Sequence, residues 1–290
     1  MATEPDSIPL RSGKTVQWFR YTQLGANTTP STEGTVGTPV AQASVTVSAT
    51  VAEYSDFSSL STLLVETAID PIVQNFAENL GYRAGLSVDT IARIEFDGAA
   101  AGQILTTMGA TLSVNDYRRV RALLNGIDVY EGPRGQSEFV SITHPYAIYD
   151  LMSDNTAGGF IDIMKFAEPD KLLYGGNANG TAPVGRVDNF VIYTSNNVNT
   201  TGTAPNVLYY NYMVGKGAVG SVDLPGAGPS NVTDPNKQSF KINVIKGGPS
   251  QADPEGMIGS YVSYRFVTVN KNLDSVNPRW YIVKCDSSLV

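Results

Sequence analysis

The sequence predicts a mixed α+β protein, and three observations lead to that prediction. Two segments near the N-terminus alternate apolar and polar residues as strands do, and residues 56–96 have helical periodicity. From residue 205 onward, short runs of strand-forming residues are separated by Gly and Pro turns. Strands and helices alternate between these regions, in a chain long enough for one large domain or two ordinary ones.

The composition describes a folded chain with few charges on its surface. It has 290 residues, of which 42% are hydrophobic and only 16% charged, against roughly 25% charged in a typical soluble domain. The hydrophobic fraction is too high for a disordered chain. No apolar run approaches the roughly 18 residues of a membrane-spanning helix, so no membrane partner is expected. We therefore expect a folded protein whose lightly charged surface is covered by other protein.

An extended arm is predicted between two N-terminal strands. Residues 15–21 (TVQWFRY) and 43–52 (ASVTVSATVA) have the composition and alternation of strands. The segment between them, 22–42, carries a single charge, Glu33, and is too polar to bury a core of its own. Because so long a connection is uncommon inside a compact domain, we expect a β-hairpin arm ordered by contacts outside its own protomer.

The longest helical pattern covers residues 56–96. It opens with Asp56 or a neighbouring serine as N-cap, and Pro71 interrupts it. After the proline, apolar residues recur at helical spacing from Ile72 to Ile94. Two interpretations stay open: an amphipathic rod of about 50 Å, at roughly 1.5 Å per residue, or two ordinary core helices kinked at Pro71.

Further helices are predicted in the middle of the chain. Ser113 has the place of an N-cap before VNDYRRVRALLNG, and Gly126 that of a left-handed C-terminal glycine. The stretch FVSITHPYAIYDLMSD, 139–154, predicts a strand that passes through His144 into a helix. The arginines at 118, 119 and 121 form a solvated basic face, and the net charge of -7 argues against tight nucleic-acid binding.

The residues offer little for catalysis or metal binding. The only cysteine, Cys285, and the only histidine, His144, do not by themselves make a zinc site. A serine triad would need His144 as its base, but no serine lies in a G-x-S-x-G elbow. Gly215, Gly217 and Gly220 match G-x-G-x-x-G, yet turn and strand residues follow instead of the helix of a dinucleotide site. We expect no catalytic, cofactor-binding or metal-binding residues and no enzyme.

Five blocks of sequence, taken in order, carry a resemblance to a known family. They are LSVNDYRRVRALL at 112–124, FVSITHPYAIYDLMSD at 139–154, FAEPDKLLYGGNANGTAPVGRVDNFVIYTSNNV at 166–198, YYNYMVGKGAVGSVDL at 209–224 and SQADPEGMIGSYVSYRFVTVNKNL at 250–273. The whole chain resembles the N4-gp56 family of tailed-phage major capsid proteins, which have the HK97-like capsid fold.

This resemblance implies an α+β architecture with an E-loop hairpin, a long spine helix, a P-domain and an A-domain. The implied parts are a short N-terminal arm at 1–12, the E-loop at 13–50, the P-domain at 51–124 with the spine helix at 56–96, the A-domain at 125–245, and returning P-domain strands at 246–290, including 258–270 and 279–285. The E-loop would lie over a neighbouring subunit.

The implied function is that of a major capsid protein. Copies would assemble in the host cytoplasm, as hexamers and pentamers, into the icosahedral shell of a bacteriophage virion. Portal and scaffolding proteins and non-specifically held double-stranded DNA are implied as partners, and the resemblance leaves room for a decoration protein. Some shells of this kind are crosslinked through an E-loop lysine. Lys14, the only lysine of residues 13–50, lies at the root of the arm, so we expect a noncovalent shell.

The same resemblance suggests residues for contact and for movement. The expected inter-subunit contacts are Trp18, Phe19, Arg20, Tyr21, Glu33, Arg83 and Arg93, and the expected hinge positions are Pro71, Gly81 and Gly85. All of them lie on the hairpin or in the predicted spine helix.

Two other classes of protein stay open. One is a different virion structural or binding β-rich protein, such as a tail, decoration or carbohydrate-binding module, which should lack a long helix between two β-rich regions. The other is a cytoplasmic hydrolase that uses His144 as its base.

Overall fold

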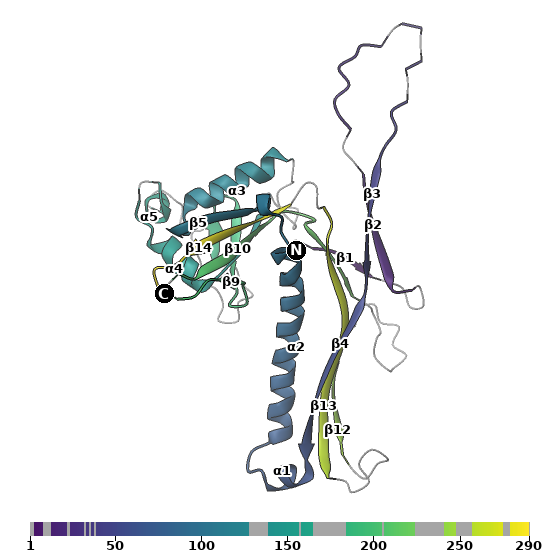
Figure 1. The fold of residues 1–290 in the computed structure, drawn as a ribbon, viewed down its shortest axis with the longest axis vertical. Helices are drawn as coiled ribbons and strands as arrows, with labels where there is room; N and C mark the ends of the chain where they lie inside the picture. The colour runs from purple at the N-terminus through teal and green to yellow at the C-terminus, as the bar shows by residue number, and fades with distance from the viewer. Residues whose placement is uncertain are drawn as a thin grey trace.

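The protein has two main sheets, a separate hairpin and one long helix, α2 (Ile72–Asp97). The computed structural model describes residues 3–7, 13–21, 24–31, 33–34, 36–37, 39–127, 139–156, 158–164, 184–204, 206–223, 241–247, 257–274 and 279–289. Residues 166–183 and 250–256 of the family-like blocks, and 8–12 of the expected N-terminal arm, lie outside these ranges. Within them the α+β prediction is confirmed, and α2 runs beside one sheet and ends at the other (Figure 1).

The five-stranded sheet is organised around its longest strand, β13 (Ile258–Asn272). Its order places β4 (Ala52–Ser61) on one side of β13, and β12 (Lys241–Lys246) and β11 (Val219–Asp223) on the other, with β1 (Thr3–Ser7) parallel to β11. Alternate side chains of β13 face α2, where Val262 and Phe266 pack with Leu80 and Ala84 of the helix. This alternation is what gives the sheet one covered face.

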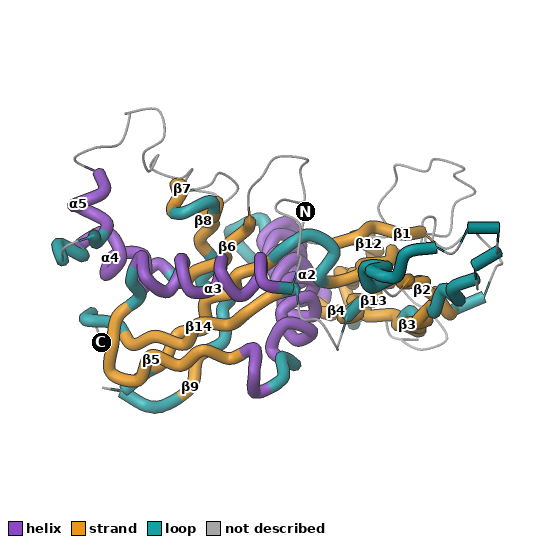
Figure 2. The backbone as a smooth tube through the Cα atoms, turned by 90° about the horizontal axis from the view of Figure 1, so that it is seen from above, coloured by secondary structure: helices purple, strands orange, loops and turns teal. Residues whose placement is uncertain are grey.

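The seven-stranded sheet forms the second, more compact part (Figure 2). Its order is β5 (Ile104–Thr111), β14 (Trp280–Asp286), β10 (Leu208–Val214), β6 (Phe139–Thr143), β8 (Phe190–Thr194) and β7 (Gly185–Val187), with β9 (Thr200–Thr201) paired to β10. Three helices belong to this part: α3 (Val114–Gly126), α4 (Pro145–Ser153) and α5 (Phe160–Met164). The 3-10 turn η1 (Ala101–Gln103) leads into β5. Tyr117 of α3 and Leu151 of α4 are buried with Phe190 and Met213 of the sheet in one core.

The helix expected over 56–96 is wrong in its first part. Residues 52–61 form strand β4, which pairs with β13 along its length, and serine with aromatic residues suits a strand better than a helix. The first helix, α1 (Thr62–Thr67), starts at Ser61, whose Oγ accepts a hydrogen bond from the Leu64 amide, so the N-cap is neither Asp56 nor a serine beside it. Pro71 directly precedes α2 and ends no continuous helix. The long rod therefore comprises 26 residues, about 39 Å at 1.5 Å each.

The C-terminal strands divide between the two sheets. Residues 279–285 were expected in the P-domain together with 258–270. In the structure β14 lies inside the seven-stranded sheet, between β5 and β10, and β13 lies in the five-stranded sheet. Trp280, Ile282 and Val283 are fully buried, and a strand buried on both faces needs neighbours on both sides. Residues 104–124 join the same sheet or its helices, while β11 and β12 belong to the five-stranded sheet. The expected boundaries after 124 and after 245 therefore do not follow the sheets.

The hairpin expected near the N-terminus is present. Strand β2 (Thr15–Tyr21) pairs antiparallel with β3 (Ser44–Thr50) from Thr15 opposite Thr50 to Tyr21 opposite Ser44. None of the described residues between the two strands lies in a strand or helix, and the arm they form extends away from both sheets (Figure 1). At its root, Val16 and Trp18 are buried against Val222 and Leu273 of the five-stranded sheet.

The middle helices match the prediction, with one correction. Helix α3 begins after Ser113, whose amide and hydroxyl both donate to Asp116 Oδ2, at 3.0 and 2.8 Å. Gly126 is its last helical residue, and it does not have the left-handed conformation expected of it. The helix ends instead with the Ile127 amide bonded to the Leu124 and Asn125 carbonyls. Among the described residues, no helix is long and apolar enough to cross a membrane.

His144 joins β6 to α4 as the N-cap of the helix. Its Nδ1 accepts a hydrogen bond from the Tyr146 amide at 3.2 Å, and its ring stacks on Tyr209 with 4.4 Å between the ring centroids. Burial lowers the pKa of His144 below the ordinary 6.5. The neutral imidazole is thus the form that caps α4.

We predict that substituting Gly220 by alanine loosens the hairpin. A Cβ on Gly220 would lie 2.8 Å from Trp18 and from Leu273, closer than atoms can approach. The overpacking should lower the free energy of unfolding by about 1–3 kcal/mol, measured in urea, and speed proteolysis in the arm. In Gly126→Ala, which has open space around the new methyl, the free energy of unfolding should not fall and proteolysis of the arm should not become faster. Unchanged proteolysis of Gly220→Ala would mean that the hairpin does not depend on this contact.

We predict that His144 makes the folded chain lose stability as the pH falls below about 6.5. Because its folded-state pKa is lowered, the unfolded chain binds the proton more readily, and stability falls as pH drops below about 6.5. His144→Asn keeps a capping acceptor and removes the titration. Its urea midpoint should match that of the parent at about pH 8 and exceed it at about pH 5. A parallel pH dependence of the two proteins would contradict the assignment.

Candidate functional site

The groups that could have supported catalysis have structural partners. Burial raises the pKa of the Cys285 thiol to about 12, and its sulfur accepts a hydrogen bond from Asn211. The buried carboxylate of Asp150 accepts bonds from Ser288 near the C-terminus. Within the described residues, no three His, Cys, Asp or Glu side chains gather as metal ligands would. His144 caps a helix, so each of these side chains has a partner that stabilises the fold.

The glycine pattern at 215–220 lies in a link between sheets. Gly215 and Gly217 follow β10, and Gly217 turns the chain with a φ of 66°. Strand β11 comes next, where a dinucleotide site would have a helix. Gly220 lies in that strand, under Trp18. In this pattern, Gly217 therefore allows a turn and Gly220 allows the close approach of Trp18.

The arm extends away from both sheets, and its described residues from 24 to 43 are exposed. Phe19 and Tyr21 project from one face of the hairpin and are 62% and 72% exposed. Their cross-strand neighbours on that face are Thr46 and Ser44. Further along, Leu24 and Val40 are exposed as well. Exposed aromatic and aliphatic side chains on a nearly uncharged arm are typical of a surface that binds other protein.

Two of the expected contact residues lie on the opposite face of the hairpin. Trp18 is 8% exposed and packs on its own five-stranded sheet. Arg20 forms an ion pair with Asp274, with 2.7 Å between Nη1 and Oδ2. Both residues thus have partners within the chain, which they use to hold the hairpin root in place.

The other expected contact residues are spread over the molecule. Glu33 is exposed in the arm. Arg83, on α2, pairs with Asp56 of β4 at 2.8 Å and keeps 66% of its side chain exposed. Arg93 lies near the end of α2, and its guanidinium bonds to Asn197. The structure does not bring these residues together with the aromatic side chains of the arm.

A second exposed surface was missed in the sequence. The face of the five-stranded sheet that points away from α2 carries Phe57 and Ile245, 68% and 58% exposed, with Tyr261 opposite Ile245. Serines and the ion pair between Glu53 and Arg265 complete it. The alternation that could have revealed this surface lies in residues 52–61, which the helical interpretation obscured. We call it the outer sheet face.

The expected hinge positions differ in their surroundings. Pro71 lies between α1 and α2. At Gly81 a Cβ would come within 3.2 Å of Ile242 on β12, whereas at Gly85 it would meet nothing within 4 Å. Gly81 is therefore a packing position, and Gly85 is an unpacked glycine in the exposed interior of a helix.

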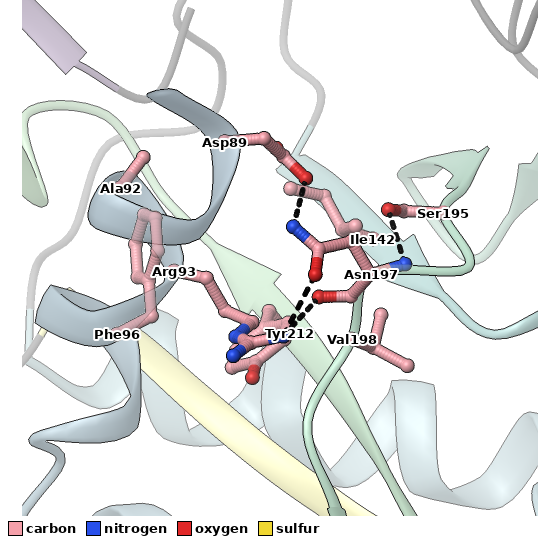
Figure 3. A pocket seen from close by; sticks show the side chains of 9 residues that line it. All are labelled: Asp89, Ala92, Arg93, Phe96, Ile142, Ser195, Asn197, Val198 and Tyr212. Carbon is pink, nitrogen blue, oxygen red and sulfur yellow. Dashed lines mark hydrogen bonds between the residues drawn. The ribbon is translucent and has the colours of Figure 1, made fainter. Parts of the chain in front are cut away.

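A small cavity lies where α2 meets the seven-stranded sheet. Figure 3 shows the residues that line it. They come from α2 between Asp89 and Phe96, from the strands (Ile142 and Tyr212), and from the loop at 195–198. Its volume is about 70 Å³, enough for a few water molecules. The cavity is a feature of the junction and too small for a cofactor.

The comparisons with known proteins place the fold. No family model matches the sequence, and no curated protein matches it. Among solved structures, the capsid of Ralstonia phage GP4 has a TM-score of 0.71 at 11% identity, covering 99% of this chain and 87% of that chain. The capsid of cyanophage P-SCSP1u has a TM-score of 0.66 at 13% identity, with 99% and 87% covered.

The likeness also extends to an encapsulin. The holo-SrpI encapsulin of Synechococcus elongatus has a TM-score of 0.53 at 10% identity, with 85% of this chain and 78% of that chain covered. Identities this low establish the fold and nothing finer. The chain has the HK97-like fold of phage capsids.

Proposed function

We propose that this protein is the major capsid protein of a tailed bacteriophage and builds the icosahedral shell of the virion. The observation that carries the proposal is the likeness to phage capsids over 99% of the chain, arm included. The described side chains of the arm are exposed, as are Phe57 and Ile245 on the outer sheet face, and a lattice of identical copies would cover them. Contacts that are modest one by one suffice when they repeat over a closed lattice.

The finer features follow from the sequence resemblance. The five ordered blocks favour the N4-gp56 family, and hexamers and pentamers as the assembly units in the host cytoplasm. Portal and scaffolding proteins, and a decoration protein where one exists, would be further partners. Double-stranded DNA would be enclosed without specific binding, since a net charge of -7 provides no excess of cations to hold phosphates. On this proposal the protein acts through its shape and is not an enzyme.

The parts of the fold then take these roles. Residues 13–50 are the E-loop, and α2 is the spine helix. The P-domain is the five-stranded sheet with α2, and the A-domain is the seven-stranded sheet with α3 to α5. This division reassigns residues 101–124 and 279–289 to the A-domain, and β11 and β12 to the P-domain, relative to the boundaries expected from the sequence.

Phe19 and Tyr21 are the hairpin residues best suited to contact a neighbouring subunit. Both are exposed, and both lie on the face of the hairpin opposite Trp18 and Arg20. Aromatic side chains contribute much of the binding energy of protein interfaces. Glu33, also exposed, would join the contact from the arm, and Arg83 would join it from α2.

The alternatives are less well supported. A different β-rich virion protein should lack a long helix between two β-rich regions, and α2 is such a helix. A hydrolase would need His144 as a free base, whereas its Nδ1 accepts a hydrogen bond from the Tyr146 amide.

Electron microscopy of the purified chain tests the proposal. Shells, tubes or capsomers should form, and boiling in detergent should return them to a single 31 kDa band because the shell is noncovalent. Particles from an infected host should contain this chain as their main protein, together with nuclease-protected DNA; protected DNA separates a phage shell from one of the encapsulin kind. A persistent monodisperse monomer would overturn the proposal, and ladders that survive boiling would overturn its noncovalent part.

We predict that the exposed aromatic residues of the hairpin are needed for assembly and not for folding. Phe19→Ser combined with Tyr21→Ser should leave the urea midpoint unchanged. It should raise the concentration needed for assembly about tenfold or more, the equivalent of about 1.4 kcal/mol per contact. Sedimentation velocity measures that concentration. Gln17→Ser, on the same face, is the matched control and should assemble like the parent. Equal assembly of the double variant would exclude this contact.

We predict that Gly85 is kept for bending of the spine helix. Gly85→Ala should raise the free energy of unfolding of the unassembled chain by about 0.5–1 kcal/mol, since glycine is costly inside a helix. It should also slow expansion of assembled shells, followed by light scattering. Asn75→Ala, exposed on the same helix, raises helix propensity without removing a glycine and should not slow expansion. Expansion at the parental rate in Gly85→Ala would refute the hinge.

A further inference from the structure

The junction between α2 and the seven-stranded sheet has an apolar half. Phe96, in the last turn of the helix, meets Trp280 of β14 edge to face, with 5.9 Å between the ring centroids. The indole Nε1 donates to the Phe96 carbonyl at 3.3 Å. Phe96 is 8% exposed and Trp280 fully buried. Separating these rings would expose a large apolar area to water, so this half of the junction is built to stay closed.

The second half is polar and depends on one loop residue. Asn197 lies between β8 and β9, and its Nδ2 donates to Asp89 Oδ2 at 2.7 Å (Figure 3). The same Nδ2 donates to Thr90 Oγ1 at 3.1 Å. Arg93 Nη1 donates to the carbonyl oxygen of Asn197 at 2.7 Å and to its Oδ1 at 2.9 Å. We call these four bonds the clasp. They attach one turn of α2 to the loop between β8 and β9.

The clasp continues toward the sheet through Asp97. Arg93 Nε lies 3.4 Å from Asp97 Oδ2, and the Tyr212 hydroxyl donates to Asp97 Oδ1. Burial, followed by the bond to Asp97, raises the pKa of the Tyr212 phenol, which therefore stays protonated and remains a donor. Asp89, Arg93 and Asp97 are spaced four residues apart, so they share one face of the helix.

Two features make the clasp easier to open than the apolar half. The side chains of Arg93 and Asp97 are 25% and 19% exposed, so water can replace the bonds that they lose. The cavity of about 70 Å³ is lined by Asp89, Arg93 and Asn197 of the clasp, together with Tyr212. Side chains that border a void can change rotamer without the clash that a close-packed core would impose.

We propose that the clasp is a releasable lock on the angle between α2 and the seven-stranded sheet, with the Phe96–Trp280 contact as its pivot. With the clasp closed, the two halves of the chain move as one body. When it opens, the seven-stranded part turns about the pivot while the apolar contact persists. Given the proposed capsid function, the lock would hold the free subunit in one shape and let neighbouring copies select another.

The experiment measures the junction in the unassembled full chain. Spin labels at Gln74→Cys on α2 and Asn155→Cys beyond α4 report the distance between the two parts, and the native Cys285 is buried. In Asn197→Ala the distance distribution should be about twice as broad as in the parent, and the amides of residues 90–97 should exchange about fivefold to tenfold faster. Asn196→Ala, the exposed neighbour in the same loop, should match the parent in both measurements.

A second variant keeps the test decisive. Arg93→Gln should broaden the distribution like Asn197→Ala, and the double variant should broaden it no further, since both changes open the same lock. Far-ultraviolet circular dichroism and a single cooperative melt verify that each variant is folded. A narrow, parental distribution in folded Asn197→Ala would overturn the lock, as would equal broadening in Asn196→Ala. These readings use the free subunit, so they stand or fall separately from the formation of shells.

Discussion

The packing of α2 against β13 is the interaction on which the rest of the molecule depends. Leu80 and Ala84 of the helix bury Val262 and Phe266, and β13 in turn pairs with β4, β12 and β11. The far end of the same helix enters the core of the other sheet through Phe96. One helix thus contacts both sheets, and the hairpin root packs on the five-stranded sheet through Trp18. The two sheets also meet directly, because Val219 of β11 is buried in the same core as Phe96 and Trp280.

The surfaces left open are a consequence of that layout. A helix covers only one face of the five-stranded sheet, so Phe57 and Ile245 remain exposed on the other. The hairpin uses Trp18 and Arg20 to hold itself in place, and it presents Phe19 and Tyr21 outward. A monomer with such surfaces would be poorly soluble at 16% charge. The same surfaces suit a subunit that neighbours cover on several sides, which connects the composition to the proposed shell.

Short-range patterns predicted the local elements well, and long-range pairing explains the errors. The hairpin, α3 with its Ser113 cap, and the passage from β6 through His144 into α4 were all readable, because turn, cap and alternation signals act over a few residues. Residues 56–61 were misassigned because the helical pattern that follows them was extended over the alternation of β4, whose pairing partner β13 lies far away in the sequence. The same limit grouped 279–285 with the P-domain strands, whereas β14 pairs with β5 and β10 in the seven-stranded sheet. Arg93 was expected at an inter-subunit contact, and the sequence held no sign of its bond to Asn197 of the same chain.

By itself, the sequence determined that the chain is an α+β protein with a polar arm of a single charge and a long stretch of helical periodicity, and that catalysis would have at most one histidine to use. These properties depend on composition and on neighbours within a few positions. Only the tertiary structure decided which side of each strand is covered, how the chain crosses between the two sheets, and which charged groups are paired inside. Those outcomes depend on contacts between residues far apart in the chain, such as Trp18 with Gly220 or Arg93 with Asn197. The spacing of residues along the sequence does not predict such contacts. They contribute free energy only after the fold has brought both partners together.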